Sequence, residues 1–504
     1  MSDARYLLRS SIARTVFAIA QVVIAFFMMP YLVRTLGERW YGIWVVISGL
    51  VGNYYLLDLG LAMSVTRFIA RGLARNDADD TNTVINTSLV IYSILATIIV
   101  LVTLGIVWAT PLFFHEADSI GVVRLTILVV GVQFATDFPF KSLTGIISSH
   151  LRYDLLMYAR LINLAVSSGL TWYLVGNGYG ILALAVVGLV CEPFSSVFFF
   201  FVSKRLFPEM RFGWRFVKPD MVKELFGYSV WAFLIQLANQ ARFKMDSVVI
   251  ANVISARAVT HYAVGLRLVE YFVDMVYRAT NMMTPVFTRY YFQNQHDQIR
   301  EKLLLLTRLN TVLALFGGGM ILIVGRAFIE RWMGPDFASA YPVLVILMVG
   351  MATELIGCYA DNLFYAFSKH KSLAIVNVIE GVANVALSLM LIRVWGIAGV
   401  AAGTAIPLIV MRLTVIPVLI TRMVGITLGT YFMNMVPTAA FTLLYLAIYW
   451  YLSKPYLTPS YPSVLAVGLL GVPLYVMVVP FVTFTRAERS YLLGLLPRRP
   501  AWLT

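Results

Sequence analysis

Charged residues are scarce in this chain of 504 residues, at 13%, whereas they make up about a quarter of ordinary soluble domains. Hydrophobic residues fill 60% of the sequence, and the mean hydropathy is +0.81. This composition excludes a soluble globular protein, because most side chains would have no favourable contact with water. A helix needs about 20 apolar residues to cross a bilayer, so the chain has room for about 14 spans. We therefore predict an all-α integral membrane protein.

Cysteine and recognisable motifs are also scarce. The two cysteines, Cys191 and Cys358, lie far apart in apolar segments, which argues against a disulfide framework or a metal site. The sequence has no G-x-x-x-x-G-K-[ST] phosphate loop, which excludes an ATP-driven pump. The basic residues give a net charge of +14 but form no continuous patch, so we expect no nucleic-acid partner. The apolar segment after Met1–Ser11 is too long for a signal peptide, so the first helix is expected to stay in the protein.

The hydropathy pattern predicts the spans and their orientation. The spans are 12–33, 41–66, 83–109, 121–147, 155–175, 180–203, 225–250, 258–283, 303–325, 340–366, 372–392, 396–420, 430–452 and 462–483. With the N-terminus inside, the inner connections and adjoining helix ends hold 24 lysines and arginines, and the outer ones hold 7. Because inner segments carry the basic excess, we predict that both termini lie on the cytoplasmic side of the inner membrane.

An internal repeat predicts two lobes. The segment Tyr179-Gly-Ile-Leu-Ala-Leu-Ala185 at the start of helix 6 matches Trp395-Gly-Ile-Ala-Gly-Val-Ala401 at the start of helix 12. The longest polar connection falls between the two copies. We predict an N-lobe at 1–205 with helices 1–6, a cytoplasmic linker at 206–223, a C-lobe at 224–421 with helices 7–12, and helices 13–14 with a cytoplasmic tail at 422–504.

Charged residues inside the spans mark candidate functional sites. Predicted helix 8 carries Arg267, Glu270, Asp274 and Arg278, which fall within an arc of about 80° at 100° per residue. Each charge costs about 2.5–3.5 kcal/mol at the centre of a lipid-facing helix, so this stripe is expected to face a hydrated cavity. Other spans carry further polar residues, namely Asn239, Arg242, Lys244 and Asp246 in helix 7, Glu354 and Asp361 in helix 10, Glu380 in helix 11 and Asp58 in helix 2.

Two interpretations of these charges remain open. Some of them can form i,i+3 or i,i+4 ion pairs, such as Arg267 with Glu270, and merely pack the lobe. Alternatively, the cations can bind an anionic substrate while the carboxylates bind protons or sodium ions for coupling. The sequence does not choose among the individual carboxylates.

Three N-terminal segments carry a resemblance to a known family. They are Pro30-Tyr-Leu-Val-Arg-Thr-Leu-Gly37, Trp40-Tyr-Gly-Ile-Trp44 and Leu57-Asp-Leu-Gly-Leu61. Together they resemble the signature of the polysaccharide biosynthesis transporters, which are Wzx-type O-antigen and exopolysaccharide flippases. These flippases belong to the multidrug/oligosaccharidyl-lipid/polysaccharide exporter (MOP) superfamily.

The resemblance implies a V-shaped pair of six-helix bundles that alternate between inward-open and outward-open states. Such a protein would move a polyprenyl-pyrophosphate-linked oligosaccharide across the inner membrane without making or breaking a bond, beside a polysaccharide polymerase and chain-length proteins. By analogy the substrate's anionic groups would meet Arg242, Lys244, Arg267 and Arg278 in the C-lobe and Arg160 in the N-lobe. No cofactor is expected apart from a proton or sodium gradient.

Two alternatives fit the same composition. A cation-coupled drug or metabolite exporter of the same superfamily would share the fold, although the four C-lobe cations argue against cationic drugs as substrates. A membrane glycosyltransferase or polymerase would need a sizeable outer loop or soluble domain for catalysis, and the predicted outer connections are all short.

Overall fold

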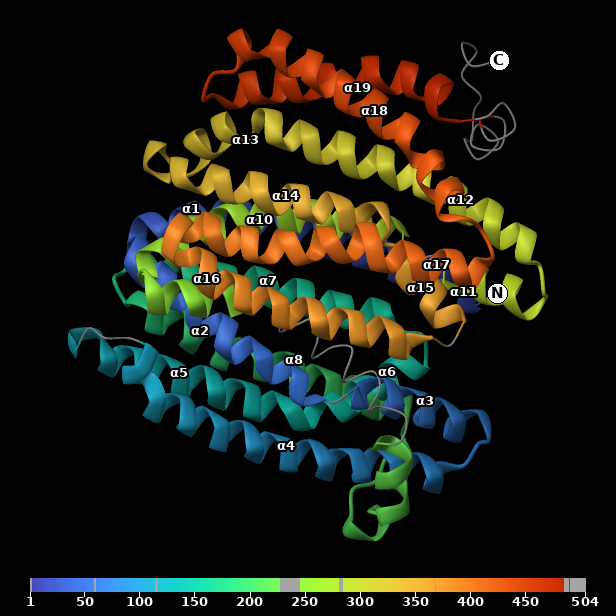
Figure 1. Ribbon diagram of the computed structural model, residues 1–504. Helices are drawn as coiled ribbons and strands as arrows, with labels where there is room; N and C mark the ends of the chain where they lie inside the picture. The colour runs from blue at the N-terminus through green and yellow to red at the C-terminus, as the bar shows by residue number, and fades with distance from the viewer. Residues whose placement is uncertain are drawn as a thin grey trace. The chain divides into compact units, whose positions relative to one another are not determined.

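Figure 1 shows the computed structural model, which describes residues 2–58, 60–113, 117–226, 245–280, 284–367, 369–484 and 489. Every regular element in these ranges is a helix, which confirms the predicted all-α class. Ten helical segments within them are long and apolar enough to cross a membrane, and one, Lys371–Val424, has 54 residues. The total of about 14 spans remains a prediction, because most of the predicted span 225–250 lies outside the described residues.

The chain divides into two compact units, Met1–Thr260 and His261–Thr504. The predicted lobe boundaries remain predictions. Unit 1 contains α1 Ser2–Leu36, α2 Glu38–Gly52, η1 Asn53–Asp58, α3 Leu61–Ala74, α4 Ala78–Phe113, α5 Ala117–Asp137, η2 Phe138–Phe140, α6 Lys141–Ser149, α7 Tyr153–Gly176, α8 Gly180–Leu206 and η3 Trp214–Phe216.

Unit 2 is also helical throughout its described part. It contains most of α10 Ala256–Thr280, then α11 Thr284–Phe292, α12 His296–Val312, η5 Leu313–Gly317, α13 Gly318–Trp332, η6 Pro335–Ser339, α14 Ala340–Ile356, α15 Ala360–Ala366, α16 His370–Val410, η7 Met411–Val415, α17 Ile416–Val424, α18 Leu428–Ser453, η8 Lys454–Tyr456 and α19 Tyr461–Thr483. The elements η5 and η7 are π-helical turns, which often occur at functional positions.

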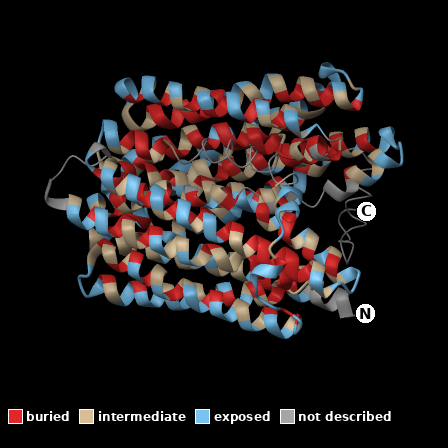
Figure 2. Ribbon diagram, turned by 90° about the horizontal axis from the view of Figure 1, so that it is seen from below, coloured by how far each residue is buried: buried red, intermediate tan, exposed pale blue. Residues whose placement is uncertain are grey.

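The helices expose apolar side chains on their outer faces. In unit 1, α4 packs beside α5 and α1 beside α7. On α4, Leu101 and Trp108 are exposed, whereas Tyr92 and Ile99 are buried against the rest of the unit. Figure 2 shows how exposed and buried residues alternate along the helices, as expected for helices that pack on one side only. An exposed apolar face on a helix of this length is suited to contact with lipid.

The glycines of the internal repeat both have a positive φ. Gly180 at the start of α8 has a φ of 63°, and Gly396 within α16 has a φ of 57°. Both values lie in the left-handed region, which glycine adopts without steric cost. The turn at Gly396 divides α16 close to the predicted boundary between helices 11 and 12. Both copies of the sequence repeat therefore carry a glycine at a positive φ.

Two membrane segments of unit 1 are interrupted. The segment Glu38–Ala74 is broken by η1 and by Gly60, whose φ is 74°, and the segment Ile120–Ser149 is broken by η2, which contains Pro139. Interrupted helices expose backbone polar groups inside a membrane protein, and such groups frequently line binding sites. Charged side chains flank both interruptions.

Candidate functional site

Unit 2 holds a buried network around Arg412, a residue that the sequence analysis did not single out. Arg412 lies in η7, and its side chain is only 5% exposed. Its Nη2 atom donates a hydrogen bond to Glu354 Oε1 at 3.4 Å and lies 4.0 Å from Glu380 Oε2. The hydroxyl of Tyr277 donates to the same Glu354 oxygen at 2.7 Å. The Glu354 carboxylate thus joins α10, α14 and η7, and Arg412 links them to α16.

Three acidic residues named in the sequence analysis lie in or beside this network. Glu354 and Glu380 are both buried, and Asp361 lies close enough to interact electrostatically with Arg412. Farther along α16, Asn384 Nδ2 donates to Thr404 Oγ1 at 3.1 Å. Glu354 and Glu380, both named in the sequence analysis, therefore lie in one network, and their functional role remains a prediction.

Burial makes these charges energetically important. Each ion removed from water costs several kcal/mol, and the cost is offset only when opposite charges and hydrogen bonds lie close by. The Arg412 guanidinium supplies the positive charge beside Glu354 and Glu380. A buried guanidinium therefore compensates the charge of two buried carboxylates.

The helix 8 stripe lies on a more exposed part of α10. Arg267 Nη1 and Glu270 Oε2 form an i,i+3 ion pair at 2.9 Å, with side chains 45% and 35% exposed. Asp274 is exposed, and the Arg278 side chain lies outside the described part of the structure. The ion pair expected under the packing interpretation is therefore present. Both of its side chains are also accessible to a ligand.

Part of the predicted C-lobe site lies outside the described residues. This applies to Asn239, Arg242 and Lys244. Asp246, one helical turn after Arg242 in the sequence, is described and buried.

Unit 1 holds a second polar interior at its two helix interruptions. Asp58, at the end of η1, is buried and accepts a hydrogen bond from the Tyr92 hydroxyl at 2.7 Å. Its other carboxylate oxygen accepts from the Ala62 amide at 3.4 Å, at the start of α3. The ring of Tyr92 packs edge-on against Phe138 of η2, with centroids 5.9 Å apart. Asp58 thus links the two interruptions through Tyr92.

Lys141 is a second residue that the sequence analysis missed. It follows η2, and its Nζ atom lies 3.8 Å from the ring centroid of Phe138 and 4.8 Å from that of Tyr55. Asp58 and Asp137 interact with it electrostatically, yet within the described ranges Lys141 makes no ion pair. The two aromatic faces stabilise the ammonium group by cation–π attraction. The signal available in the sequence was its position two residues after Pro139, which interrupts the helix.

Asp137, Glu192 and Arg160 continue the polar interior of unit 1. The Ser196 hydroxyl donates to Asp137 Oδ1 at 2.9 Å. Glu192 interacts electrostatically with Asp137 and Arg160, and the Arg160 residue itself is exposed. Asn163 Nδ2 donates to Ser195 Oγ at 2.9 Å in the same region of α8. Arg160 is therefore an exposed cation that interacts with the Glu192 carboxylate of α8.

The charged side chains of both units are suited to binding ions and polar ligands. Carboxylates can bind a proton or a cation, and exposed guanidinium and ammonium groups can bind anionic oxygens. Across the described ranges, no group of three or more histidine, cysteine, aspartate or glutamate side chains is arranged to hold a metal ion.

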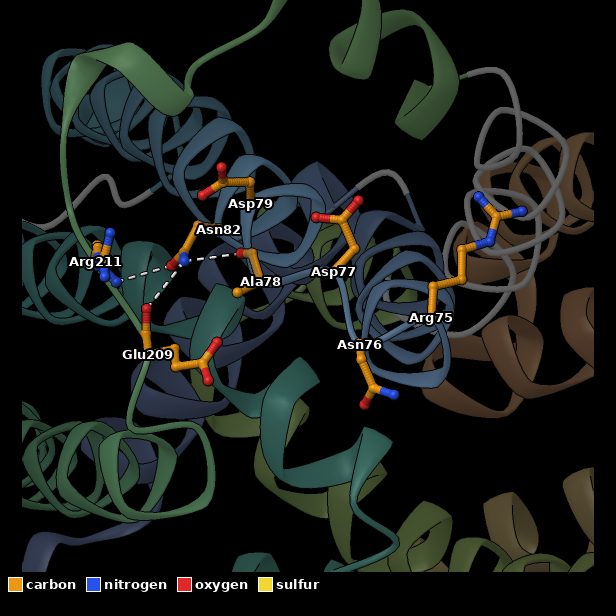
Figure 3. A pocket seen from close by; sticks show the side chains of 8 residues that line it. All are labelled: Arg75, Asn76, Asp77, Ala78, Asp79, Asn82, Glu209 and Arg211. Atoms are coloured by element: carbon orange, nitrogen blue, oxygen red, sulfur yellow. Dashed lines mark hydrogen bonds between the residues drawn. The ribbon is translucent and has the colours of Figure 1, made fainter.

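A polar cavity of about 500 Å³ lies at one end of unit 1 (Figure 3). Both charge signs line it, from the turn between α3 and α4 and from the segment after α8; the residues are Arg75, Asn76, Asp77, Ala78, Asp79, Asn82, Glu209 and Arg211. Because acidic and basic side chains are mixed here, the cavity favours neither an anion nor a cation. None of the residues that line it is among those predicted to bind substrate.

The fold defines the class of protein. The structure is similar to that of the lipid II flippase MurJ in an inward closed conformation, with a TM-score of 0.70, 13% identity and coverage of 93% of this chain and 98% of that one. It is also similar to an inward-facing MATE multidrug resistance transporter of the MOP superfamily, with a TM-score of 0.66, 16% identity and coverage of 81% and 98%. The chain therefore has the MOP transporter fold.

Sequence comparison gives the family. The model of a family described as polysaccharide biosynthesis protein matches residues 31–342, so the chain belongs to this family. The chain is 22% identical to the uncharacterized membrane protein EpsK of Bacillus subtilis (strain 168) over 486 residues, 94% of each chain. It is 21% identical over 414 residues to a Shigella flexneri protein named as an O-antigen transporter, covering 80% of this chain and 95% of the relative. The family resemblance is confirmed, and the protein is a multi-pass membrane transporter of polysaccharide biosynthesis.

Proposed function

We propose that this protein moves a polyprenyl-pyrophosphate-linked oligosaccharide from the inner to the outer leaflet of a bacterial inner membrane by alternating access. The observation that carries the proposal is that both units of an apolar, membrane-spanning chain keep charged side chains in their interiors. An interior that served only for packing could consist of apolar side chains, which avoid the cost of burying charge. Membership of a polysaccharide biosynthesis family supports a lipid-linked sugar as the substrate class.

The cations provide the proposed substrate contacts. Arg267 and Arg160 are exposed cations of the two units, and Lys141 adds an ammonium group held between two aromatic rings. Guanidinium groups can bind phosphate oxygens through two parallel hydrogen bonds, whereas an ammonium group acts as a point charge. The same role is proposed for Asn239, Arg242, Lys244 and Arg278 on sequence grounds alone.

The carboxylates provide the proposed coupling sites. A proton or a sodium ion would bind at one or more of Asp58, Asp246, Glu270, Asp274, Glu354, Asp361 and Glu380.

We further propose that the protein makes and breaks no bond, and that it works beside a polymerase and chain-length proteins that use the delivered substrate.

The first test is the leaflet location of lipid-linked oligosaccharide in membrane vesicles with and without this protein. When the protein is absent, we expect intact lipid-linked oligosaccharide to accumulate on the cytoplasmic face, because its synthesis would continue while its transport would stop. Intermediate that reaches the outer face but is not extended would contradict the proposal and indicate an enzyme that acts outside.

A cation-coupled drug or metabolite exporter is a second candidate function. The similarity of the fold to MATE multidrug transporters favours it. An unchanged pool of lipid-linked sugar combined with altered drug sensitivity in cells that lack the protein would identify the exporter.

A further inference from the structure

The segment after α8 is attached to the first turns of α4. Asn82 Nδ2 donates to the carbonyl oxygen of Glu209 at 3.0 Å, and its Oδ1 accepts from the amide of Arg211 at 2.8 Å. Asn86 forms the same kind of pair, accepting from the amide of Gly213 at 3.0 Å and donating to the Arg211 carbonyl oxygen at 2.8 Å. Two asparagines thus hold this segment, which Figure 1 shows in green beside α4.

The level of this attachment follows from the sequence of α4. Residues 78–88 are mostly polar, and the 22 residues from Leu89 to Thr110 contain no charge. At 1.5 Å per residue the apolar stretch is about 33 Å long, close to the ~30 Å of the hydrocarbon layer. Thr87 Oγ1, which accepts from the Lys218 amide at 3.2 Å, is only two residues before Leu89. The part of the segment from Gly213 to Lys218 therefore lies within about one helical turn of the hydrocarbon boundary.

The outward side chains of this segment are aromatic and basic. Trp214 is 81% exposed and Phe212 is 50% exposed, although the Phe212 ring also stacks on Phe200 with centroids 6.2 Å apart. Arg211, Arg215 and Lys218 are exposed beside them. From Lys204 to Glu224 the chain carries six basic and three acidic residues. In water alone, two large aromatic rings at this degree of exposure would be unfavourable.

We propose that Phe212 and Trp214, with Arg211, Arg215 and Lys218, form a lipid-binding surface that inserts into the headgroup region of the bilayer and prefers anionic phospholipid. Aromatic side chains, tryptophan above all, partition into this region, and each basic residue near an anionic leaflet contributes about 1 kcal/mol, or about a five-fold preference. The hydrogen bonds to Asn82 and Asn86 hold the surface at the depth that this requires. The inference concerns the membrane and is independent of the transported substrate.

The surface is tested by depth measurements on the full chain in nanodiscs. A nitroxide label is placed on Gly213→Cys in a C191A/C358A background, because a side chain at Gly213 meets no heavy atom closer than 3.9 Å and both aromatic residues are kept. Reference labels are placed at Leu101→Cys, an exposed position near the middle of the uncharged stretch of α4, and at Asp220→Cys, whose native side chain is 92% exposed. The readout is the accessibility of each label to oxygen and to a water-soluble nickel chelate.

We expect the label at 213 to lie between the two references, and to move deeper when phosphatidylglycerol is added to phosphatidylcholine. F212S/W214S should raise its nickel accessibility in both lipid mixtures, whereas R211Q/R215Q/K218Q should remove only the response to phosphatidylglycerol. W108S, at the opposite end of α4, removes an exposed tryptophan and should change nothing. A label at 213 that is as accessible to nickel as the label at 220 in both mixtures would overturn the proposal and leave this surface as a docking site for a protein.

Discussion

Arg412 is the residue whose surroundings are most distinctive in unit 2. It carries a full charge at 5% side-chain exposure and contacts Glu354, which also accepts from Tyr277. The sequence analysis passed over it because it is the only basic residue in the predicted span 396–420 and has no charged residue three or four positions away. Its partners come from other helices, so only the fold reveals them.

Replacing Arg412 by methionine should lower the free energy of unfolding by about 3–5 kcal/mol, because the carboxylates of Glu354 and Glu380 lose the guanidinium that compensates their charge. Thermal unfolding of the purified protein in detergent measures the effect. The matched control is R326M, which removes an exposed i,i+4 pair with Glu330 in the same unit and should cost less than about 1 kcal/mol. Equal losses in the two variants would contradict the role assigned to the buried network.

Tyr92 and Tyr54 provide a matched comparison in unit 1. The Tyr92 hydroxyl donates to the Asp58 carboxylate at 2.7 Å, whereas the Tyr54 hydroxyl pairs with the neutral Thr103 hydroxyl at the same distance. Hydrogen bonds to charged groups contribute about 1.5–3 kcal/mol, against about 0.5–1.5 kcal/mol for neutral pairs. Y92F should therefore lower the unfolding temperature more than Y54F. The reverse order would contradict the larger contribution assigned to the hydrogen bond between Tyr92 and Asp58.

Arg267 tests the proposed substrate contacts. R267A should abolish transport of lipid-linked oligosaccharide while the protein stays in the membrane, because the side chain is 45% exposed and its ion pair with Glu270 contributes little to stability. R278A is expected to behave in the same way, on the sequence pattern of predicted helix 8. Complementation of a deletion strain, with the protein level in the membrane as a control, measures both. Normal transport in both variants would exclude this stripe from the substrate path.

At the level of the helices, the sequence predicted regular structure better than its interruptions. The turn at Gly396 was anticipated because the repeat starts there, and its left-handed conformation explains the glycine. The breaks at η1 and η2 were not anticipated, because apolar residues continue across both and hydropathy averages over a whole span. Asp58 was recognised as a buried acid, but its position at a helix end required the structure.

The repeated turn can be tested by substitution of its two glycines. G180A and G396A should each destabilise the protein by about 1–2 kcal/mol, because alanine is strained at these positive φ values. G105A, in the helical interior of α4 with open space around the added carbon, should stabilise it by about 0.5–1 kcal/mol. Unfolding temperatures of the three purified variants measure the difference. Stabilisation by G180A would show that the turn relaxes without strain.

At the level of the whole molecule, composition determined the class and a short signature determined the family. The scarcity of charge predicted a membrane protein, and the three N-terminal segments predicted a polysaccharide transporter, as the family match confirms. Residues that act within one helix were recognisable, such as the pair of Arg267 with Glu270. Networks that join several helices were not, because hydropathy and periodicity contain no information about which helices are neighbours.

The predicted orientation can be tested by labelling in intact cells. Lys454 is an exposed residue of η8 in a predicted outer connection, and Lys223 is an exposed residue of the predicted cytoplasmic linker. A membrane-impermeant thiol reagent should modify K454C and leave K223C unmodified until the cells are opened. The opposite pattern would reverse the assigned sides of the membrane.

The matching turns at Gly180 and Gly396 also concern the ancestry of the chain. Two copies of one ancestral bundle, joined by duplication, would at first have had equivalent interiors. The present copies both keep a glycine with a positive φ, but their interiors differ, since unit 1 surrounds Lys141 with aromatic rings and unit 2 sets Arg412 among carboxylates. A duplicated bundle whose two interiors hold different charges no longer has two equivalent halves.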